Sequence, residues 1–412
     1  GDAAEAAALL ENPDPLLVFD HQPVGDPAEA IFMLPGGGAQ YAGMARDLYQ
    51  TEPVFREWMD RGLDHMAQAH GTDLRALWLP EPGAEAEADR RLLQPSLQLP
   101  LLMITEYALA QLWISWGVRP VALIGHSMGE NTAACIAGVM SFEDCIGLVR
   151  LRGALMDRVP AGGMLSVPLE PHEFQAELDE LGLDLAAVNG PSMSVVSGPD
   201  AVLAQFAARM AAREIECQRI AISIAAHSRL LDGIMAEFRA YLAGIPLHAP
   251  QIPIISNRTG LPMTAEQATS PDYWTSHLRG TVRFADGIAH LAQVPGRVFL
   301  EVGPGRAMQA MAKANPAVAA NQVISTLRHR DHATGDDTYF MGALARFWAC
   351  GGGIDWDQIW GGARRQRLSL PGYVFQRKRY FIERSSAVAA DAADELARID
   401  EPSEIGRASC RE

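Results

Sequence analysis

The stretch VALIGHSMGENTAACIAGVM, residues 121–140, decides the fold. Its first five residues have the apolar character of a short strand, and the residues after Met128 favour a helix. Between the two, Gly125, Ser127 and Gly129 form the GxSxG pattern of a nucleophile elbow. The glycines permit the tight turn, so the Ser127 hydroxyl is expected at the helix N-terminus, where the Met128 amide can stabilise an oxyanion. GxSxG also arises by chance in a chain with 37 glycines, but the strand and the helix around it make chance the weaker interpretation.

The segments around this motif predict an α/β fold. Apolar strands alternate with helix-patterned segments, which favours an α/β-hydrolase-like main subdomain with a parallel sheet. Residues 161–224 have strand and helix patterns in the order βαββαβ, which predicts an inserted ferredoxin-like subdomain. The predicted boundaries are a linker at 1–30, the core at 31–160 and 225–330, the insertion at 161–224, a second linker at 331–383, and a disordered or extraneous tail at 384–412.

Composition narrows the class of function. The chain has 412 residues and a formal net charge of -16, which disfavours a nucleic-acid partner because phosphate binding needs clustered Lys and Arg. Its five cysteines lack the spacing of a zinc site, so we expect reduced thiols and no metal. We find no run of about 18 apolar residues and no signal sequence, so we expect no membrane association and a cytoplasmic location. The first residue is not Met, which indicates an excised piece of a longer protein.

A serine nucleophile needs a base, and eleven histidines are available. His227 lies in the sequence Ile224-Ala225-Ala226-His227-Ser228, where the insertion rejoins the core at the start of a predicted helix. Sequence order alone leaves a core or surface histidine as the alternative. His126 adjoins Ser127 but is expected to point elsewhere along the elbow.

Several runs carry a resemblance to a known family. They include QPSLQLPLLMITEYALAQLWISWGVRPVALIGHSMGE, LVRLRGALM, AAVNGPSMSVVSG, AAHS, ISNRTG, YWTSHLRGTVRF, FLEVGPG and LPGYVFQRKRY. Together they resemble the acyltransferase domains of type I modular polyketide synthases, which in turn are similar to malonyl-CoA:acyl carrier protein transacylases. The resemblance covers about residues 31–383 in order, so it does not depend on one motif.

The resemblance implies roles for the main site residues. Ser127 matches the nucleophile and His227 the base, with a backbone carbonyl in residues 281–284 orienting the histidine in place of an acidic side chain. Arg152, twenty-five residues after the serine, matches the arginine that binds the free carboxylate of the substrate. A planar guanidinium suits this task because it can form two parallel hydrogen bonds with a carboxylate.

The loop PGGGAQ, residues 35–40, is not a phosphate loop, because it lacks the GK[ST] ending. The resemblance implies that Gln40 helps to form the oxyanion hole together with the Met128 amide. This chain has Gly37 where the family usually has glutamine, which bears on the shape of the loop. The resemblance also places Gln94 near the site, with a structural role as the alternative.

Further residues are expected around the pocket. Asn189 matches a recurring polar residue of the insertion, again with a structural role as the alternative, and His126 adjoins the pocket. In the family, selectivity between malonyl and methylmalonyl resembles a size gate. The gate is set by the four residues that end at the catalytic histidine, and these read HAFH or YASH. This chain has neither sequence, but Ala226 leaves room for a C2 methyl group. The sequence therefore favours acceptance of methylmalonyl, with preference for it over malonyl as a hypothesis, although one methyl contact discriminates by only about 1 to 3 kcal/mol.

The expected function is acyl transfer from coenzyme A through Ser127 to the phosphopantetheine thiol of an acyl carrier protein. The domain is expected to bind no cofactor of its own, since coenzyme A is part of the substrate and phosphopantetheine belongs to the partner. The expected partners are the acyl-CoA, the carrier protein and neighbouring synthase domains such as a ketosynthase, on whose side the 1–30 linker would lie. Two alternatives stay open, namely a serine thioesterase or hydrolase, and a catalytically silent docking module that uses the basic segment 376–380.

Overall fold

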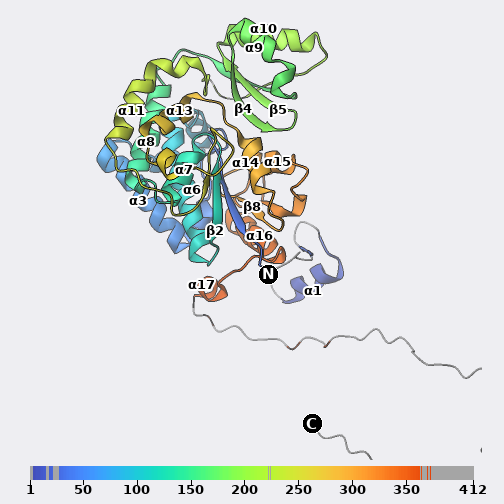
Figure 1. Cartoon of the computed structure of the whole chain (residues 1–412). Helices are drawn as coiled ribbons and strands as arrows, with labels where there is room; N and C mark the ends of the chain where they lie inside the picture. Colours follow the sequence, from blue (N-terminus) through green and yellow to red (C-terminus); the bar gives the residue numbers. More distant parts are fainter. Residues whose placement is uncertain are drawn as a thin grey trace, which may run out of the picture. The chain divides into compact units, whose positions relative to one another are not determined.

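The computed structural model describes residues 3–14, 18–21, 27–220, 222, 224–361, 363, 369 and 372. Its main sheet has five strands in the order β7-β2-β1-β8-β9, and every neighbouring pair is parallel. Figure 1 shows β2 of this sheet between α6 (Pro95–Ser115) and α14 (Phe284–Leu291). The strands are β1 (Ala30–Leu34), β2 (Pro120–Gly125), β7 (Ile254–Ile255), β8 (Val298–Glu301) and β9 (Val323–Ser325). The predicted α/β fold with a parallel-sheet core is confirmed.

Helices cover both faces of this sheet, so alternate residues of each strand enter different cores. Phe32 and Leu34 of β1 pack in one core with α3 (Pro53–His70), α6 and α8 (Phe142–Met156). Ile31 and Met33 pack in the other with α14 and α15 (Ala307–Lys313). The remaining helices outside the insertion are α1 (Ala3–Glu11), α2 (Arg46–Thr51), α4 (Arg75–Trp78), α5 (Glu85–Arg91), α7 (Gly129–Ile136), η2 (Arg229–Ile234), α11 (Met235–Ala243), α12 (Ala265–Ala268), α13 (Pro271–Arg279), η3 (Ala320–Gln322), α16 (Asp336–Ala349) and α17 (Trp356–Trp360).

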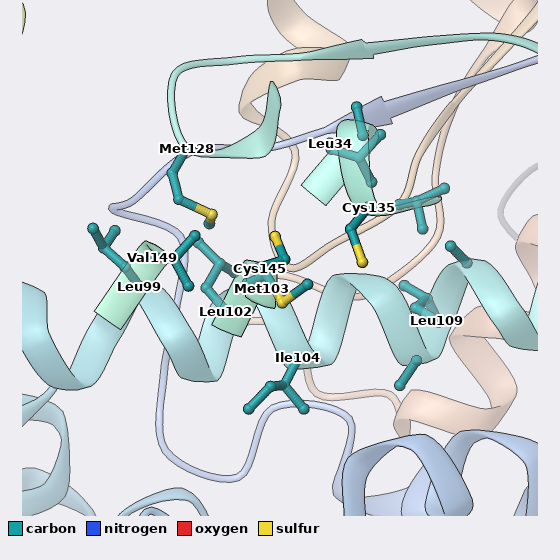
Figure 2. Packing of buried hydrophobic residues seen from close by; sticks show 14 of the residues in the cluster. Leu34, Leu99, Leu102, Met103, Ile104, Leu109, Met128, Cys135, Cys145 and Val149 are labelled. Atoms are coloured by element: carbon teal, nitrogen blue, oxygen red, sulfur yellow. The ribbon is translucent and has the colours of Figure 1, made fainter. Parts of the chain in front are cut away.

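The central helix α6 is apolar on nearly all sides. Figure 2 shows its Leu102, Met103 and Leu109 in the cluster that also holds Cys135 of α7 and Cys145 of α8. By length and composition α6 could cross a membrane, so the prediction that no segment reaches that threshold is wrong. Its most apolar window is 78% buried inside the protein, which is typical of a core helix.

The insertion forms a second, antiparallel sheet of four strands in the order β4-β5-β3-β6. This is the strand order of a ferredoxin-like βαββαβ unit, as the sequence predicts. Phe174 and Phe206 lie at the centre of its own small core. Its elements are β3 (Gly163–Val167), η1 (Pro171–Glu173), α9 (Gln175–Leu181), β4 (Asp184–Gly190), β5 (Met193–Gly198), α10 (Asp200–Ala211) and β6 (Gln218–Arg219).

The predicted domain boundaries stay predictions. Of the linker at 331–383, the structure describes residues 331–361, 363, 369 and 372. The basic segment 376–380 and the tail at 384–412 lie outside the described residues.

Candidate active site

Ser127 lies in the turn between β2 and α7, with a φ of 54° in the left-handed region. The flanking glycines allow this turn to fit against its neighbours. A Cβ at Gly129 would lie 1.9 Å from the Leu34 carbonyl oxygen, and one at Gly125 would lie 2.0 Å from the Glu130 nitrogen. The GxSxG motif therefore forms the strained elbow that the sequence predicts.

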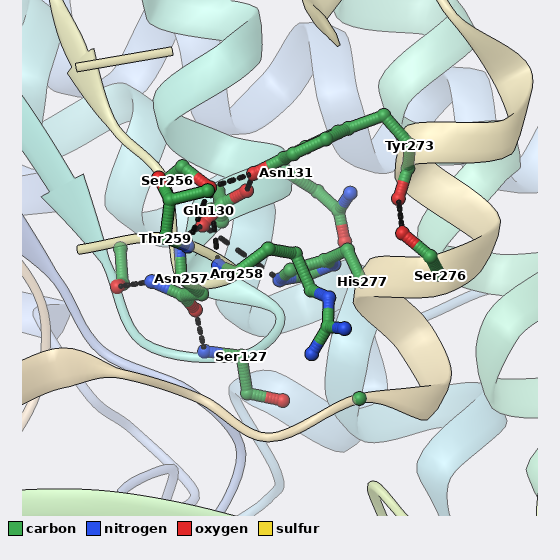
Figure 3. A network of polar contacts seen from close by, with 12 residues as sticks. Ser127, Glu130, Asn131, Ser256, Asn257, Arg258, Thr259, Tyr273, Ser276 and His277 are labelled. Carbon is green, nitrogen blue, oxygen red and sulfur yellow. Dashed lines mark hydrogen bonds and ion pairs between the residues drawn. The ribbon is translucent and has the colours of Figure 1, made fainter. Parts of the chain in front are cut away.

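Asn257 holds this elbow from the segment that follows the neighbouring strand β7. Its Oδ1 accepts a hydrogen bond from the Ser127 amide at 2.9 Å, and its Nδ2 donates to the Gly125 carbonyl at 2.7 Å. Figure 3 shows the side chain reaching from the segment after β7 to the turn. This role of Asn257 is not among the sequence predictions. A polar residue just after a strand next to β2 is nevertheless a usable signal, since the carboxyl ends of parallel strands meet at one edge of a sheet.

Ser127 and His227 are brought together. Ser127 Oγ lies 2.7 Å from His227 Nε2, and His227 Nδ1 lies 2.9 Å from the Gly280 carbonyl oxygen. A carbonyl can only accept, so Nδ1 carries the proton and Nε2 is free to take one from the serine. His227 lies just before η2, also in the left-handed region with a φ of 56°.

The predicted carbonyl partner, within residues 281–284, is wrong by one residue. The Val282 carbonyl accepts from Val188 of the insertion at 2.8 Å, and the Thr281 carbonyl accepts from Arg258 at 3.4 Å. Those carbonyls have other partners, and the preceding one, that of Gly280, faces His227.

Burial keeps His227 neutral. The side chain is buried, which lowers its pKa to about 3, and the nearby positive charge of Arg152 acts in the same direction. The imidazole is therefore an unprotonated acceptor at neutral pH.

Arg152 reaches the same serine from α8. Its Nη2 donates to Ser127 Oγ at 2.8 Å, and its Nη1 donates to Asn131 Oδ1 at 2.9 Å. The side chain is only 1% exposed, and burial lowers its pKa to about 10, so it stays charged at neutral pH. Within the described ranges no carboxylate forms an ion pair with it.

A buried polar network lies behind the elbow (Figure 3). Glu130 Oε2 accepts from the backbone N–H of Asn257 at 2.5 Å, and Glu130 Oε1 lies 2.6 Å from the Tyr273 hydroxyl. The same hydroxyl lies 2.7 Å from Ser256 Oγ. Burial raises the pKa of Glu130 to about 7, against the lowering effect of these hydrogen bonds. The network fixes the segment that carries Asn257, and so the elbow.

The insertion contacts the elbow through His126. Its Nε2 lies 2.8 Å from Asn189 Oδ1, and burial lowers the pKa of His126. The His126 ring thus contacts the insertion, and Asn189 joins the insertion to the active-site turn.

The other predicted residues lie around the site at different distances from the chemistry. The loop 35–40 passes the serine, since a Cβ at Gly36 would lie 3.4 Å from Ser127 Cβ. The Gln40 side chain accepts from the Gly38 amide at 2.8 Å and donates to the Leu92 carbonyl at 3.3 Å. Met128 directly precedes α7, so its amide lies at the helix N-terminus.

Gln94 and Ala226 complete the set of predicted site residues. Gln94 is exposed and donates to Asp157 at 3.1 Å, and among the described residues no hydrogen bond joins its side chain to Ser127 or His227. Ala226, next to His227, is partly buried and packs against the core that contains Ile31 and Met33. Among the described residues, no group of three or more His, Cys, Asp or Glu is placed to hold a metal ion.

Comparisons with known proteins identify the family that this chain resembles. The acyl transferase domain family matches residues 31–344. The spectinabilin polyketide synthase system protein NorB from Streptomyces orinoci is 35% identical over 380 residues, which cover 90% of this chain and 17% of that protein. The mycoketide-CoA synthase of Mycobacterium tuberculosis is 35% identical over 366 residues, which cover 89% of this chain and 8% of that protein. The chain thus spans only a small part of the length of these curated relatives.

Solved structures show the same fold. The acyl transferase domain of ZmaA has 33% identity and a TM-score of 0.82, with 89% of this chain and 85% of that chain covered. The acyltransferase domain from the second module of the salinomycin polyketide synthase has 36% identity and a TM-score of 0.79, covering 90% and 84%. The malonyl CoA-acyl carrier protein transacylase of Coxiella burnetii, at 22% identity and a TM-score of 0.68, covers 79% and 98% and shows the fold alone.

The lowered pKa of His227 predicts how Ser127 responds to pH. Because the imidazole stays neutral far below its ordinary pKa, labelling of Ser127 by an uncharged fluorophosphonate should keep a constant rate from about pH 8 to about pH 5. The measurement is the labelling rate by intact mass, with circular dichroism to verify the fold at each pH and His227→Ala to show dependence on the base. A rate that falls with a midpoint near pH 6.5, the ordinary histidine value, would contradict this account.

Proposed function

Because the chain belongs to the acyl transferase domain family of modular polyketide synthases, we propose that it moves a malonyl-type acyl group from coenzyme A through Ser127 to the phosphopantetheine thiol of an acyl carrier protein. One observation carries the proposal. Ser127 Oγ lies between a neutral imidazole at 2.7 Å and a buried guanidinium at 2.8 Å. The first activates a nucleophile, and the second suits an acyl group that ends in a carboxylate.

Acylation follows from the dyad. His227 Nε2 accepts the Ser127 proton while Oγ attacks the thioester carbonyl, and the Gly280 carbonyl stabilises the imidazolium through Nδ1–H. The amides of Met128 and Gln40 are proposed to stabilise the tetrahedral oxyanion. The C–S bond then breaks, and the coenzyme A sulfur leaves with the proton from His227. The carrier thiol attacks the acyl-serine by the same steps in reverse, so the enzyme needs no cofactor of its own.

Arg152 supports selection of a dicarboxylic acyl group. A buried charge without an ionic partner is costly, by several kcal/mol in real proteins, and a bound carboxylate offsets that cost. Acetyl brings no such group. We therefore propose that the substrate carries a free carboxylate and that the partners are the acyl-CoA, a carrier protein and neighbouring synthase domains such as a ketosynthase.

Ala226 supports acceptance of methylmalonyl and a preference for it over malonyl. The residue directly precedes His227, is partly buried, and has the smallest side chain that still carries a Cβ. A methyl group on C2 of the acyl chain therefore meets less crowding here than it would beside a phenylalanine.

The proposed function predicts which acyl group the enzyme takes up. Incubated with equal concentrations of acetyl-, malonyl- and methylmalonyl-CoA, the protein should gain a malonyl or methylmalonyl adduct by intact mass. Ser127→Ala should gain none, and Arg152→Ala should lose the selection against acetyl because the carboxylate has no guanidinium to bind. Arg150→Ala, on the same helix as Arg152, is the matched control and should load like the parent.

The same samples separate transfer from hydrolysis. Addition of a phosphopantetheinylated carrier protein should discharge the acyl-enzyme faster than water does. An acetyl adduct in the parent protein, or faster discharge to water, would favour the thioesterase or hydrolase alternative. Absence of any adduct would favour the silent module.

The size of residue 226 predicts the choice of extender unit. Ala226→Phe should lower the ratio of methylmalonyl to malonyl loading by about 10- to 200-fold, the range that one apolar group can give. Ala226→Ser, which keeps the side chain small, is the control and should leave the ratio close to that of the parent. An unchanged ratio in Ala226→Phe would show that residue 226 does not gate the C2 substituent.

A further inference from the structure

We propose that Asn131 is a positioning residue for Arg152 and makes the enzyme selective for acyl groups with a free carboxylate. The inference rests on the proposed function and adds a residue that the sequence analysis did not single out. It depends on three features of the described residues: the contacts of the Arg152 guanidinium, the anchoring of Asn131, and the neutrality of its amide.

The guanidinium of Arg152 has two hydrogen-bond partners among the described residues, and one of them reacts. Nη2 donates to Ser127 Oγ and Nη1 donates to Asn131 Oδ1. When Ser127 is acylated, its Oγ becomes an ester oxygen, which is a weaker acceptor than a hydroxyl. The bond to Asn131 is then the contact that persists through both halves of the cycle, so it fixes the guanidinium while the acyl group is held.

Asn131 is itself firmly anchored. It lies in the first turn of α7 and is 1% exposed. Its backbone N–H donates to the Met128 carbonyl at 2.8 Å. The backbone carbonyl of Asn131 accepts from Cys145 Sγ of α8 at 3.4 Å. The backbone of Asn131 is therefore tied to the elbow and to the helix that carries Arg152, which leaves its side chain little freedom.

The role of Asn131 requires a side chain that is uncharged as well as close to Arg152. A carboxylate at this position would form a buried ion pair with Arg152 and neutralise the charge that the substrate needs. An amide oxygen orients the guanidinium and leaves its full charge available. Asn131 Nδ2 is also buried and has no hydrogen-bond partner among the described residues, so this donor is not committed to another group.

The test compares a charged substrate with an uncharged probe on the same serine. We would measure acylation by malonyl-CoA and labelling by an uncharged fluorophosphonate in the parent, Asn131→Leu and Asn131→Asp. Both variants should lose about 10-fold or more in malonyl acylation, the effect expected for a hydrogen bond to a charged group, and keep labelling within about 3-fold. Asn131→Asp has nearly the same shape as the parent and decides the matter if Asn131→Leu does not fold.

Thr132→Val is the matched control. Thr132 is the next residue of α7, is fully buried, and donates to Glu106 at 2.7 Å, away from Arg152. Loss of that bond perturbs the same helix and should change acylation and labelling by the same factor.

The outcomes separate this inference from the proposed function. If the parent takes up malonyl and Asn131→Asp keeps its rate, or loses acylation and labelling by the same factor, the role of Asn131 is overturned and the proposed function stands. If the parent itself takes up neither malonyl nor methylmalonyl, both are overturned.

Discussion

A guanidinium charge buried beside a serine hydroxyl, with no carboxylate paired to it among the described residues, is the constraint on which the rest of the site depends. In the part of the chain that the structure describes, Arg152 donates to two neutral oxygens, those of Ser127 and Asn131. Its charge helps to keep His227 unprotonated, although burial is the larger cause. The same charge lowers the pKa of the buried Glu130, so the carboxylate behind the elbow and the guanidinium in front of it interact through space. The arrangement suits a ligand that brings its own negative charge.

The fold places these groups by joining segments that are far apart in the chain. The elbow joins β2 to α7, Arg152 comes from α8, and His227 lies where the chain returns from the insertion. The Gly280 carbonyl, which orients His227, directly precedes a segment that pairs with β4, where Val188 and Val282 are bonded at 2.8 Å. Asn189, at the end of the same strand, contacts His126 of the elbow. The insertion is thus hydrogen-bonded to His126 of the elbow and to the segment that follows Gly280. Its position is therefore linked to the orientation of the His227 ring.

Local patterns predicted the parts of this site that depend on backbone geometry. Gly125, Ser127 and Gly129 could be placed because the turn itself requires them. Arg152 and His227 could not, since their partners lie far away in sequence, and only the resemblance to a family identified them. Glu130 and Asn131 were missed because a polar residue in a helix ordinarily indicates a solvent-facing side, and Asn257 because a polar residue after a strand ordinarily indicates an exposed turn. The burial of all three comes from tertiary packing. The carbonyl that contacts His227 belongs to Gly280, one residue before the predicted range 281–284. The sequence does not show this because the pairing of β4 with Val282 is visible only in the structure.

The most direct measurement is a crystal structure of the enzyme acylated with malonyl on Ser127. The account predicts a carboxylate with both oxygens within about 3 Å of the Arg152 guanidinium, while Nη1 keeps its bond to Asn131. An acyl carboxylate that points into solvent, with the guanidinium still directed at the serine oxygen, would contradict the central claim that Arg152 is the substrate's counter-ion.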